Sequence, residues 1–517
     1  MRIPMIRRIL LAWIVVCSSG SLGGTELMRG PYLQNATPQS VTIRWRTDEA
    51  IESIVRYGTN LAELSDVRGN LVSTTNHEVQ VSGLLPDQRY FYSIGRFSEV
   101  LAGGDENHFF VTPPVPGTKK PTRIWAIGDC GIASRRFVQD PGSIKVRDGY
   151  LNFAGTNHTD VWLMLGDNAY DYGTDSEYQV AVFQTYPTLL RNTLLWSTVG
   201  NHETYEFGRT APYAYHEIFS LPANAEAGGV ISGTENYYSF DYANIHFVCL
   251  DSELSAREPD SPMAMWLHAD LAANTNDWLI AFWHSPPYTK GSHDSDDMLD
   301  NFGNMTFMRT NFVSILESYG VDLVLCGHSH NYERSFLING HYGFSQSLMP
   351  EMIKDGGSGQ PDDTGAYLKP AGPEGDKGAV YVVAGSSGHA TFVRGVPHPA
   401  MFVTLLRLGS MVIDISDNRL DAKFLRETGA IDDHFTIIKG EPAAPLRIAR
   451  VRLQNGDMEL AFKSQAGRKY HIERASDFQN GPWEVESPEI IATGATCFWF
   501  TVAEPDASVF YRVKQLD

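Results

Sequence analysis

The sequence predicts a central α/β domain, with a β-sandwich domain before it and a small β-rich module after it. In the middle of the chain, buried strand-like runs alternate with helical stretches. Residues 27–113 instead alternate apolar and polar side chains at period two. Two proline-containing linkers, Pro113–Gly117 and Glu441–Leu446, separate the three regions. With 517 residues the chain is long enough for two or three domains.

The first residues are typical of an export signal. A positive region comes first, formed by Arg2, Arg7 and Arg8. The apolar core Ile9–Val16 is too short to span a bilayer, and Cys17 makes only a poor lipidation signal. We therefore expect residues 1–23 to be a cleaved signal peptide and the protein to be secreted, periplasmic or extracellular. We expect no membrane span in the rest of the chain.

Residues 27–113 are predicted to form a β-sandwich. Apolar residues alternate along three runs: Val41, Ile43 and Trp45; Val79 and Val81; and Tyr90, Tyr92 and Ile94. Such alternation places one face of each strand in a core. The turn Leu85-Pro86-Asp87 before Tyr90 resembles that of a fibronectin type III domain.

In the central region, five apolar runs read as buried strands: Ile124–Ile127, Val161–Leu165, Leu194–Val199, Trp278–Phe282 and Val321–Cys326. Each run leads into a motif with metal-ligand residues: Gly128–Gly131, Gly166–Tyr170, Gly200–Glu203, Trp283–His284 and Gly327–His330. Open α/β sheets place their sites at the carboxyl ends of strands, so we expect these residues to converge. Carboxylate, carboxamide, imidazole and phenol groups together suit a pair of transition-metal ions, which can clamp both oxygens of a phosphoryl transfer.

Helical and further strand segments complete this region. Ile144–Phe153 is predicted to be a helix. Phe307–Tyr319 is predicted to be another, with Phe312, Ile315 and Leu316 on its apolar face. Met411–Ile415 and Leu420–Leu425 return to strands, and we expect them to close the outer sheet.

The order and spacing of the five motifs resemble those of the metallophosphoesterases, and among them the purple acid phosphatases, from about Thr122 to Phe435. Calcineurin-like phosphoesterases have a metal-binding histidine where this chain has Gly131. Tyr170 stands where purple acid phosphatases supply a phenolate. The resemblance implies that residues 121–440 form a four-layer metallophosphoesterase β-sandwich flanked by helices. It also implies that residues 27–113 are the N-terminal domain of the larger members of that family.

The resemblance also implies a ligand set for two ions. It assigns Asp129, Tyr170 and His330 to Fe(III), Asn201, His284 and His328 to a divalent zinc, iron or manganese ion, and Asp167 to a bridge between the ions. A phenolate is a hard anionic donor, which favours Fe(III). A carboxylate suits the bridge because it offers two oxygens and one negative charge.

Two histidines that are not ligands are implied to be catalytic. His202 would contact the substrate phosphate and aid proton transfer, unless it only supports the ligands. His293 lies in a loop that resembles the family's substrate loop and would bind phosphate or protonate the leaving alcohol. We expect Glu203 and Arg334 to brace the site from behind. His389 follows a further apolar run, Val380–Val383, and could approach the same rim, but we expect it to be an ordinary loop histidine.

Residues 447–517 are predicted to form a β-rich accessory domain, because short β signals recur at Tyr470–Ile472, Cys497–Val502 and Phe510–Val513. The formal charge of the whole chain is −20, which disfavours nonspecific binding to nucleic acid.

The sequence therefore predicts a secreted acid phosphatase in which a metal-bound hydroxide attacks a small phosphomonoester. A phosphodiesterase or nucleotidase on the same scaffold is an alternative. So is a glycan- or cell-surface-binding protein with a degenerate site. The oligomeric state is not predicted.

Overall fold

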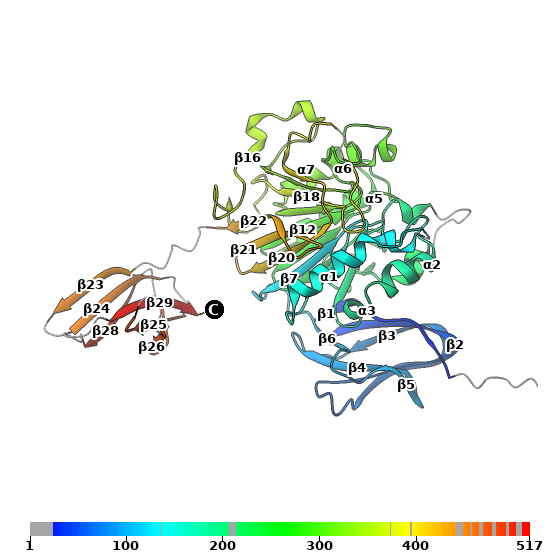
Figure 1. Cartoon of the computed structure of the whole chain (residues 1–517), viewed down its shortest axis with the longest axis horizontal. Coiled ribbons are helices and arrows are strands. Elements are labelled where there is room, and N and C mark those ends of the chain that lie inside the picture. Colours follow the sequence, from blue (N-terminus) through cyan, green and yellow to red (C-terminus); the bar gives the residue numbers. More distant parts are fainter. Residues whose placement is uncertain are drawn as a thin grey trace, which may run out of the picture. The chain divides into compact units, whose positions relative to one another are not determined.

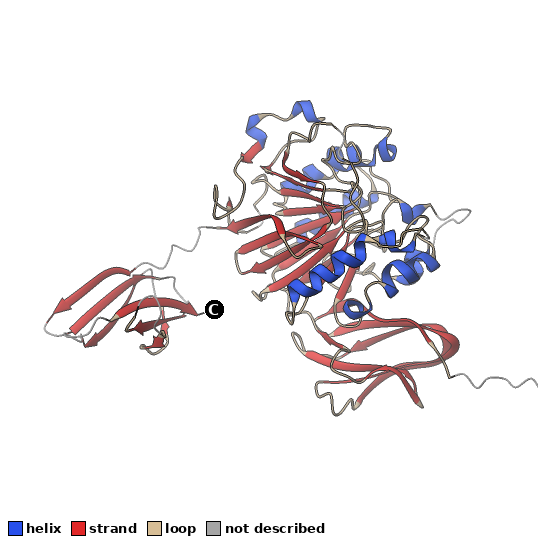
Figure 2. Ribbon diagram, in the orientation of Figure 1, coloured by secondary structure: helices blue, strands red, loops and turns tan. Residues whose placement is uncertain are grey.

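The computed structural model describes residues 24–135, 137–205, 213–372, 374–392, 395–440, 448–454, 457–464, 469–477, 482–492, 496–502 and 509–516 (Figure 1; Figure 2). The predicted signal peptide and the linker Glu441–Leu446 lie outside these residues. The chain divides into two compact units. The first contains residues up to Pro113 together with Tyr186–Leu194, and the second contains Pro114–Thr185 and Leu195–Asp517.

The first unit is a β-sandwich of antiparallel strands. They are β1 (Leu27–Thr37), β2 (Ser40–Gly58), β3 (Asp66–Ser82), β4 (Arg89–Arg96), β5 (Glu99–Gly103) and β6 (Phe109–Val111), and the unit also contains helix α3 (Pro187–Leu190). Strand β2 pairs with β1, β3 and β4, and β4 pairs with β5 and β6. All eight residues predicted from the alternation to face the core are buried, from Val41 to Ile94.

One sheet of the second unit combines parallel and antiparallel strands. Its order is β17 (Tyr367–Lys369), β22 (Ile431–Lys439), β21 (Arg419–Arg426), β20 (Gly409–Ser416), β7 (Thr122–Ile127), β8 (Val161–Met164) and β9 (Leu194–Ser197). Strands β7 and β8 are parallel, whereas β20, β21 and β22 follow one another antiparallel beside β7. The runs predicted to close this sheet lie in β20 and β21.

The other sheet has a parallel centre. Its order is β10 (Tyr238–Tyr242), β11 (Ile245–Cys249), β12 (Trp278–Trp283), β13 (Leu323–Cys326), β18 (Val380–Ala384), β14 (Tyr332–Ser335) and β19 (Met401–Leu405). Strands β11, β12, β13 and β18 are parallel, and β10, β14 and β19 are antiparallel to their neighbours. A ribbon of β15 (Leu337–Ile338) and β16 (Ile353–Asp355) follows β14.

Side chains join the two sheets face to face. Trp196 of β9 stacks on Phe240 of β10, with 3.8 Å between ring centroids. Arg334 of β14 donates to Asp433 of β22 over 2.6 and 2.9 Å, and both residues are buried. Arg334 was expected to brace the ligand site from behind. Its guanidinium instead links the sheets, because Asp433 offers it a bidentate partner.

Helices cover the outer faces of the sheets and complete four layers (Figure 2). Helix α1 (Gly142–Ala154) stacks Tyr150 on Trp125 of β7. Helices α5 (Pro262–Ala273), α6 (Asn304–Asn311) and α7 (Val313–Ser318) share a buried apolar cluster with β12 and β13. These layers confirm the predicted fold class. No helix of the described segments is long and apolar enough to cross a bilayer.

The prediction of a single helix over Phe307–Tyr319 is wrong, because the structure has two helices there. The backbone breaks at Phe312, where φ is −115°, and separates α6 from α7. The break follows Thr310 and Asn311, which have low helix propensity. Phe312, Ile315 and Leu316 are nevertheless buried together as predicted.

Short helical turns lie in the loops of the second unit: α2 (Asp175–Tyr178), α4 (Ala214–Ile218), η1 (Gly131–Ser134), η2 (Gln179–Gln184), η3 (His202–Thr204), η4 (Asp300–Gly303), η5 (Ser345–Ser347) and η6 (Pro350–Met352). The turns η1, η3 and η4 carry or adjoin the residues of the candidate site.

The C-terminal segment is β-rich. The strands of one small sheet are β23 (Ile448–Gln454), β24 (Asp457–Lys463) and β28 (Thr496–Val502). Those of the other are β25 (Lys469–Ala475), β26 (Glu484–Val485), β27 (Ile490–Ile491) and β29 (Phe510–Leu516). A separate apolar cluster, which includes Phe462, Ile472 and Trp499, fills the space between the sheets. The three predicted β segments lie in β25, β28 and β29.

Candidate metal centre

Potential ligands follow the strand ends of the second unit. Strands β7, β8, β12 and β13 are each followed within three residues by one of Asp129, Asp167, His284 and His328. Asp129, Asp167 and His328 have left-handed φ values of 55°, 52° and 67°. This conformation costs a residue other than glycine about 1–3 kcal/mol and gathers at functional sites. Here it turns the side chains of three strand ends toward a common point.

One group of side chains meets around Asp129. The Tyr170 hydroxyl donates to Asp129 Oδ1 over 3.1 Å, and His330 Nε2 lies 3.4 Å from the same oxygen. The distance between His330 Nε2 and the Tyr170 oxygen is also 3.4 Å. Asp129 and Tyr170 are fully buried. The structure thus brings together the three residues that the family resemblance assigned to one ion.

A second group meets around Asn201. Its Oδ1 lies 2.9 Å from His284 Nε2 and 3.0 Å from His328 Nδ1, and the two ring nitrogens are 3.2 Å apart. Nitrogens bound to one ion at 2.0–2.1 Å lie about 3.3 Å apart in a tetrahedral arrangement. The spacing of these donors therefore fits a shared cation.

Asp167 lies between the two groups. Asp167 Oδ1 is 3.4 Å from His284 Nε2, and the carboxylate interacts with the Tyr170 hydroxyl. Ligand atoms of Asp129, Asp167 and His284 all lie within 4.8 Å of one another, which makes these three residues a candidate metal site. The donors present, which are carboxylate, phenol, amide oxygen and imidazole, suit transition-metal ions.

Asp129 and Asp167 are two carboxylates buried close together, and a bound cation would stabilise their charges. Burial, together with the charge of Asp167, raises the pKa of Asp129 to about 7. Burial also opposes ionisation of Asp167, but His284 and His202 outweigh it and lower the pKa of this carboxyl. Burial raises the pKa of Tyr170 well above 10 and lowers the pKa of His330 to about 3. A bound cation reverses these penalties for the anionic groups.

The backbone beside the site explains why Gly131 cannot be replaced by a histidine. A Cβ atom at Gly131 would lie 2.6 Å from the nitrogen of Ala169 and 2.7 Å from its Cα. The Gly131 N–H also donates to the Asp167 carbonyl over 3.0 Å. No side chain fits here unless the segment that carries Tyr170 moves away.

Glu203 organises the loops behind the ligands. Its Oε2 accepts from the backbone N–H groups of Asp167 and Gly200 over 3.0 and 2.6 Å. Its Oε1 accepts from those of Asn168 and Ala169 over 2.7 and 3.2 Å. Glu203 thus ties the segment after β8 to the segment after β9, as expected for a residue that braces the site.

The two predicted catalytic histidines border the candidate ligands. The His202 ring meets Tyr170 edge to face at 4.4 Å, and its Nδ1 donates to the Asp171 carbonyl over 2.7 Å. The His293 ring stacks on His328 with 3.9 Å between centroids. Both side chains are partly exposed, at 22% and 27%, so a substrate can reach them.

Two further side chains lie at the site; sequence reasoning treated His389 as a less favoured candidate and missed Arg135. His389 follows β18 and lies against His330, with 4.0 Å between ring centroids, so it is not the ordinary loop histidine that was expected. Arg135 places its guanidinium 4.6 Å from the ring centroid of Tyr170. The signal for His389 was its position after a buried parallel strand. No comparable pattern marks Arg135.

Comparisons with known proteins agree with this geometry. Residues 122–332 match the calcineurin-like phosphoesterase family, and residues 31–112 match the N-terminal domain of purple acid phosphatases. Purple acid phosphatase 15 of Arabidopsis thaliana is 28% identical over 328 residues, which cover 55% of this chain and 57% of the relative. Acid phosphatase A of Cryphonectria parasitica is 24% identical, and the match covers 62% of this chain and 78% of the fungal protein. This chain spans less than two thirds of the Arabidopsis relative.

Solved structures show the same fold. The purple acid phosphatase PPD1 from yellow lupin seeds superposes with a TM-score of 0.62 at 17% identity. The match covers 80% of this chain and 74% of the lupin chain. PhoD superposes with a TM-score of 0.54 at 14% identity, and the match covers 79% of this chain and 90% of the PhoD chain. The fold and the strand-end site define a metallophosphoesterase. Residues 122–332 therefore form a calcineurin-like phosphoesterase domain, and residues 31–112 form an N-terminal domain of the purple acid phosphatase type. The predicted resemblance is thereby confirmed.

Proposed function

We propose that this protein is an exported, binuclear-metal acid phosphatase that hydrolyses small phosphomonoesters. The observation that carries the proposal is the convergence of two donor groups on either side of Asp167. Matches to several purple acid phosphatases support the same reaction class. The export signal, residues 1–23, and the domain limits 27–113, 121–440 and 447–517 are part of the proposal.

The proposed ligands keep their predicted assignments. Asp129, Tyr170 and His330 would hold Fe(III), Asn201, His284 and His328 would hold zinc, iron or manganese, and Asp167 would contact both ions. When bound, such a pair activates water and polarises the phosphate oxygens.

The surrounding side chains have separate roles in this proposal. Because Nδ1–H of His202 is engaged by the Asp171 carbonyl, His202 would turn Nε2 to the phosphate and donate from it as an imidazolium. His293, whose ring stacks on His328, would protonate the departing alcohol. Glu203 would keep the two ligand segments in register through its four backbone contacts.

One purified sample tests the proposal. We expect about two metal ions per chain, a visible absorption band in the oxidised protein, and faster turnover of p-nitrophenyl phosphate than of its bis-ester. Faster turnover of the diester would instead favour the phosphodiesterase or nucleotidase alternative. A metal-free protein without turnover would support the binding-protein alternative.

A further inference from the structure

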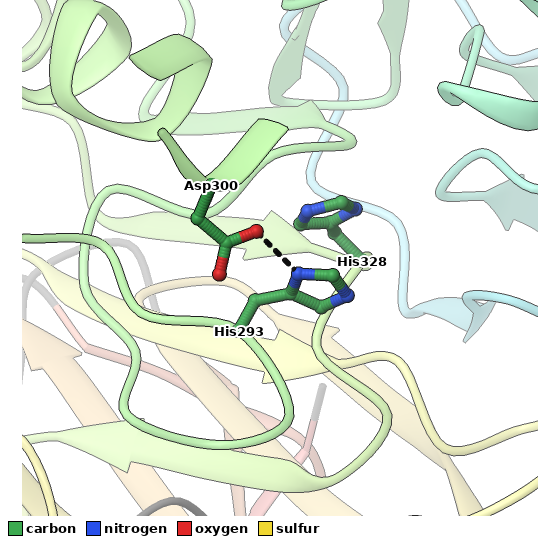
Figure 3. Close-up of side chains that lie close together, drawn as sticks. All are labelled: His293, Asp300 and His328. Atoms are coloured by element: carbon green, nitrogen blue, oxygen red, sulfur yellow. Dashed lines mark hydrogen bonds and ion pairs between the residues drawn. The ribbon is translucent and has the colours of Figure 1, made fainter. Parts of the chain in front are cut away.

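His293 and Asp300 form a side-chain pair beside the candidate metal centre (Figure 3). His293 Nδ1 lies 2.7 Å from Asp300 Oδ1. The other carboxylate oxygen accepts from the backbone N–H of Asp294 over 2.9 Å. Because an ionised carboxylate only accepts hydrogen bonds, Nδ1 of His293 carries the proton. The pair therefore fixes one tautomer of the ring and leaves Nε2 available.

The His293 ring is also fixed in place over the proposed ligands. It stacks on His328 at an interplanar angle of 28° and meets His330 edge to face, with 6.0 Å between centroids. The preceding residue, Ser292, accepts from the backbone N–H of His330 over 2.8 Å. Stacking sets the plane of the ring, and Asp300 sets which nitrogen points away from the loop.

Asp300 is itself anchored to the end of a ligand-bearing strand. The next residue, Asn301, has a left-handed φ of 44° and donates to Ser285 Oγ over 2.8 Å and to Glu253 Oε2 over 3.2 Å. Ser285 directly follows His284. A strained conformation held by such contacts is typical of a segment that places a functional side chain.

The same three residues, His293, Asp300 and His328, have ligand atoms within 4.8 Å of one another and so could hold an ion of their own. Two observations favour the hydrogen-bonded pair. His328 Nδ1 already faces Asn201. The 2.7 Å contact between His293 and Asp300 is also a normal charge-assisted hydrogen bond, whereas two ligands of one ion lie about 3 Å apart.

We propose that Asp300 is a positioning residue: its carboxylate accepts from Nδ1–H of the His293 imidazolium, so that Nε2–H gives its proton to the leaving oxygen and the ring is left neutral with its proton on Nδ1. This inference rests on the phosphatase function proposed above. A histidine donates efficiently only when its tautomer and its direction are set by a partner on the other nitrogen.

Substitution of Asp300 by asparagine separates this role from a structural one. We expect Asp300→Asn to lower kcat on an alkyl phosphate about 10–100-fold, with both metal ions retained and KM little changed. On 2,4-dinitrophenyl phosphate the loss should stay within about threefold, because that leaving group departs without a proton. Asp297→Asn is the matched control, since Asp297 is an exposed acid of the same loop whose carboxylate accepts from the backbone of Leu299.

Two further measurements decide the proposal. The double variant Asp300→Asn/His293→Gln should be no slower than His293→Gln alone, because both changes remove one function. At a pH where the His293 ring of the zinc-loaded protein is neutral, its ¹⁵N shifts should show an Nδ1–H tautomer that Asp300→Asn shifts toward Nε2–H. The proposal would be overturned if Asp300→Asn slowed both esters equally, or if the losses in the double variant were additive. It would also be overturned if Asp300→Asn removed a metal ion held by His293, Asp300 and His328, or left the tautomer unchanged. If the wild type hydrolyses neither ester, the proposed function fails, and the tautomer still decides whether Asp300 orients His293.

Discussion

The rings of Tyr170 and His202 meet edge to face, with 4.4 Å between centroids and an angle of 68° between planes. The backbone N–H of His202 donates to Asp167 Oδ1 over 3.0 Å, while its Nε2 is 3.9 Å from Oδ2. His202 therefore borders the proposed ligands, yet its Nδ1 is turned to the Asp171 carbonyl. This arrangement suits contact with a substrate better than binding of a metal ion.

His202→Ala should keep both metal ions and lose about 10²–10⁴ in turnover, the usual range of general acid–base catalysis. Metal analysis and steady-state kinetics on p-nitrophenyl phosphate measure the two effects. His268→Ala, at an exposed position on α5, is the control. Loss of a metal ion in His202→Ala, or unchanged turnover, would reassign His202 to structural support.

Asp167→Ala should abolish activity and most metal binding, because this carboxylate contacts members of both donor groups. The measurement is metal content after dialysis, together with turnover. Asp140→Ala is a suitable control, since the side chain of Asp140 is 73% exposed and pairs with the surface residue Lys145. A variant with two ions and near-native turnover would contradict the proposed site.

Removal of the residues after Leu446 should leave phosphatase activity largely intact. The module has its own apolar cluster, and every proposed ligand precedes it. Turnover and metal content of the truncated chain, compared with those of the full chain, provide the test. Loss of turnover in a folded, metal-loaded truncate would show that the module shapes the site.

The buried residue His246, which is not one of the proposed ligands, should make the stability of the protein depend on pH. Burial alone would lower the pKa of His246, but hydrogen bonds of 2.8 Å to both Asp241 and Asp270 raise it to about 9 from 6.5. The resulting stabilisation, roughly 3 kcal/mol, is fully present below pH 6.5 and is lost as the pH rises through about 9.

Denaturant unfolding at pH 6.5, 8 and 9.5 measures this effect. The free energy of unfolding of the wild type should fall across the series, and the fall should be much smaller in His246→Gln. His434→Gln is the control, because the side chain of His434 is 38% exposed. Parallel pH profiles for the wild type and His246→Gln would refute the assignment.

The sequence predicted the strand ends well, because each buried run is short, strongly apolar and closed by a ligand-type residue. That pattern marked the five motifs that contain the proposed ligands, and the family resemblance picked out the seven residues within them. The structure places six of these residues in two groups, with Asp167 between them. Contacts made across loops left weaker signals in the sequence. His389 lies beside His330 only because β18 is the parallel neighbour of β13, a pairing that no local motif encodes.

The remaining errors have similar causes. Arg334 sits near the motif Gly327–His330 in sequence, but its strand turns it toward Asp433 of the other sheet. Phe307–Tyr319 has an uninterrupted apolar face, so periodicity alone could not reveal the break at Phe312. In both cases tertiary contacts decided what the local sequence left open.

Tyr170 carries the most specific prediction, because its phenolate would bind Fe(III). The oxidised protein should be purple or pink through charge transfer from the phenolate to the ion. Tyr170→Phe should abolish that band while Asp129, Asp167 and His330 still bind a metal ion more weakly, and the ferric ion should become easier to reduce after losing an anionic donor. Tyr172→Phe is the matched control, since the Tyr172 side chain is 51% exposed two residues away. A colourless wild type that contains oxidised iron would exclude the phenolate assignment, and the phosphodiesterase alternative would then gain support.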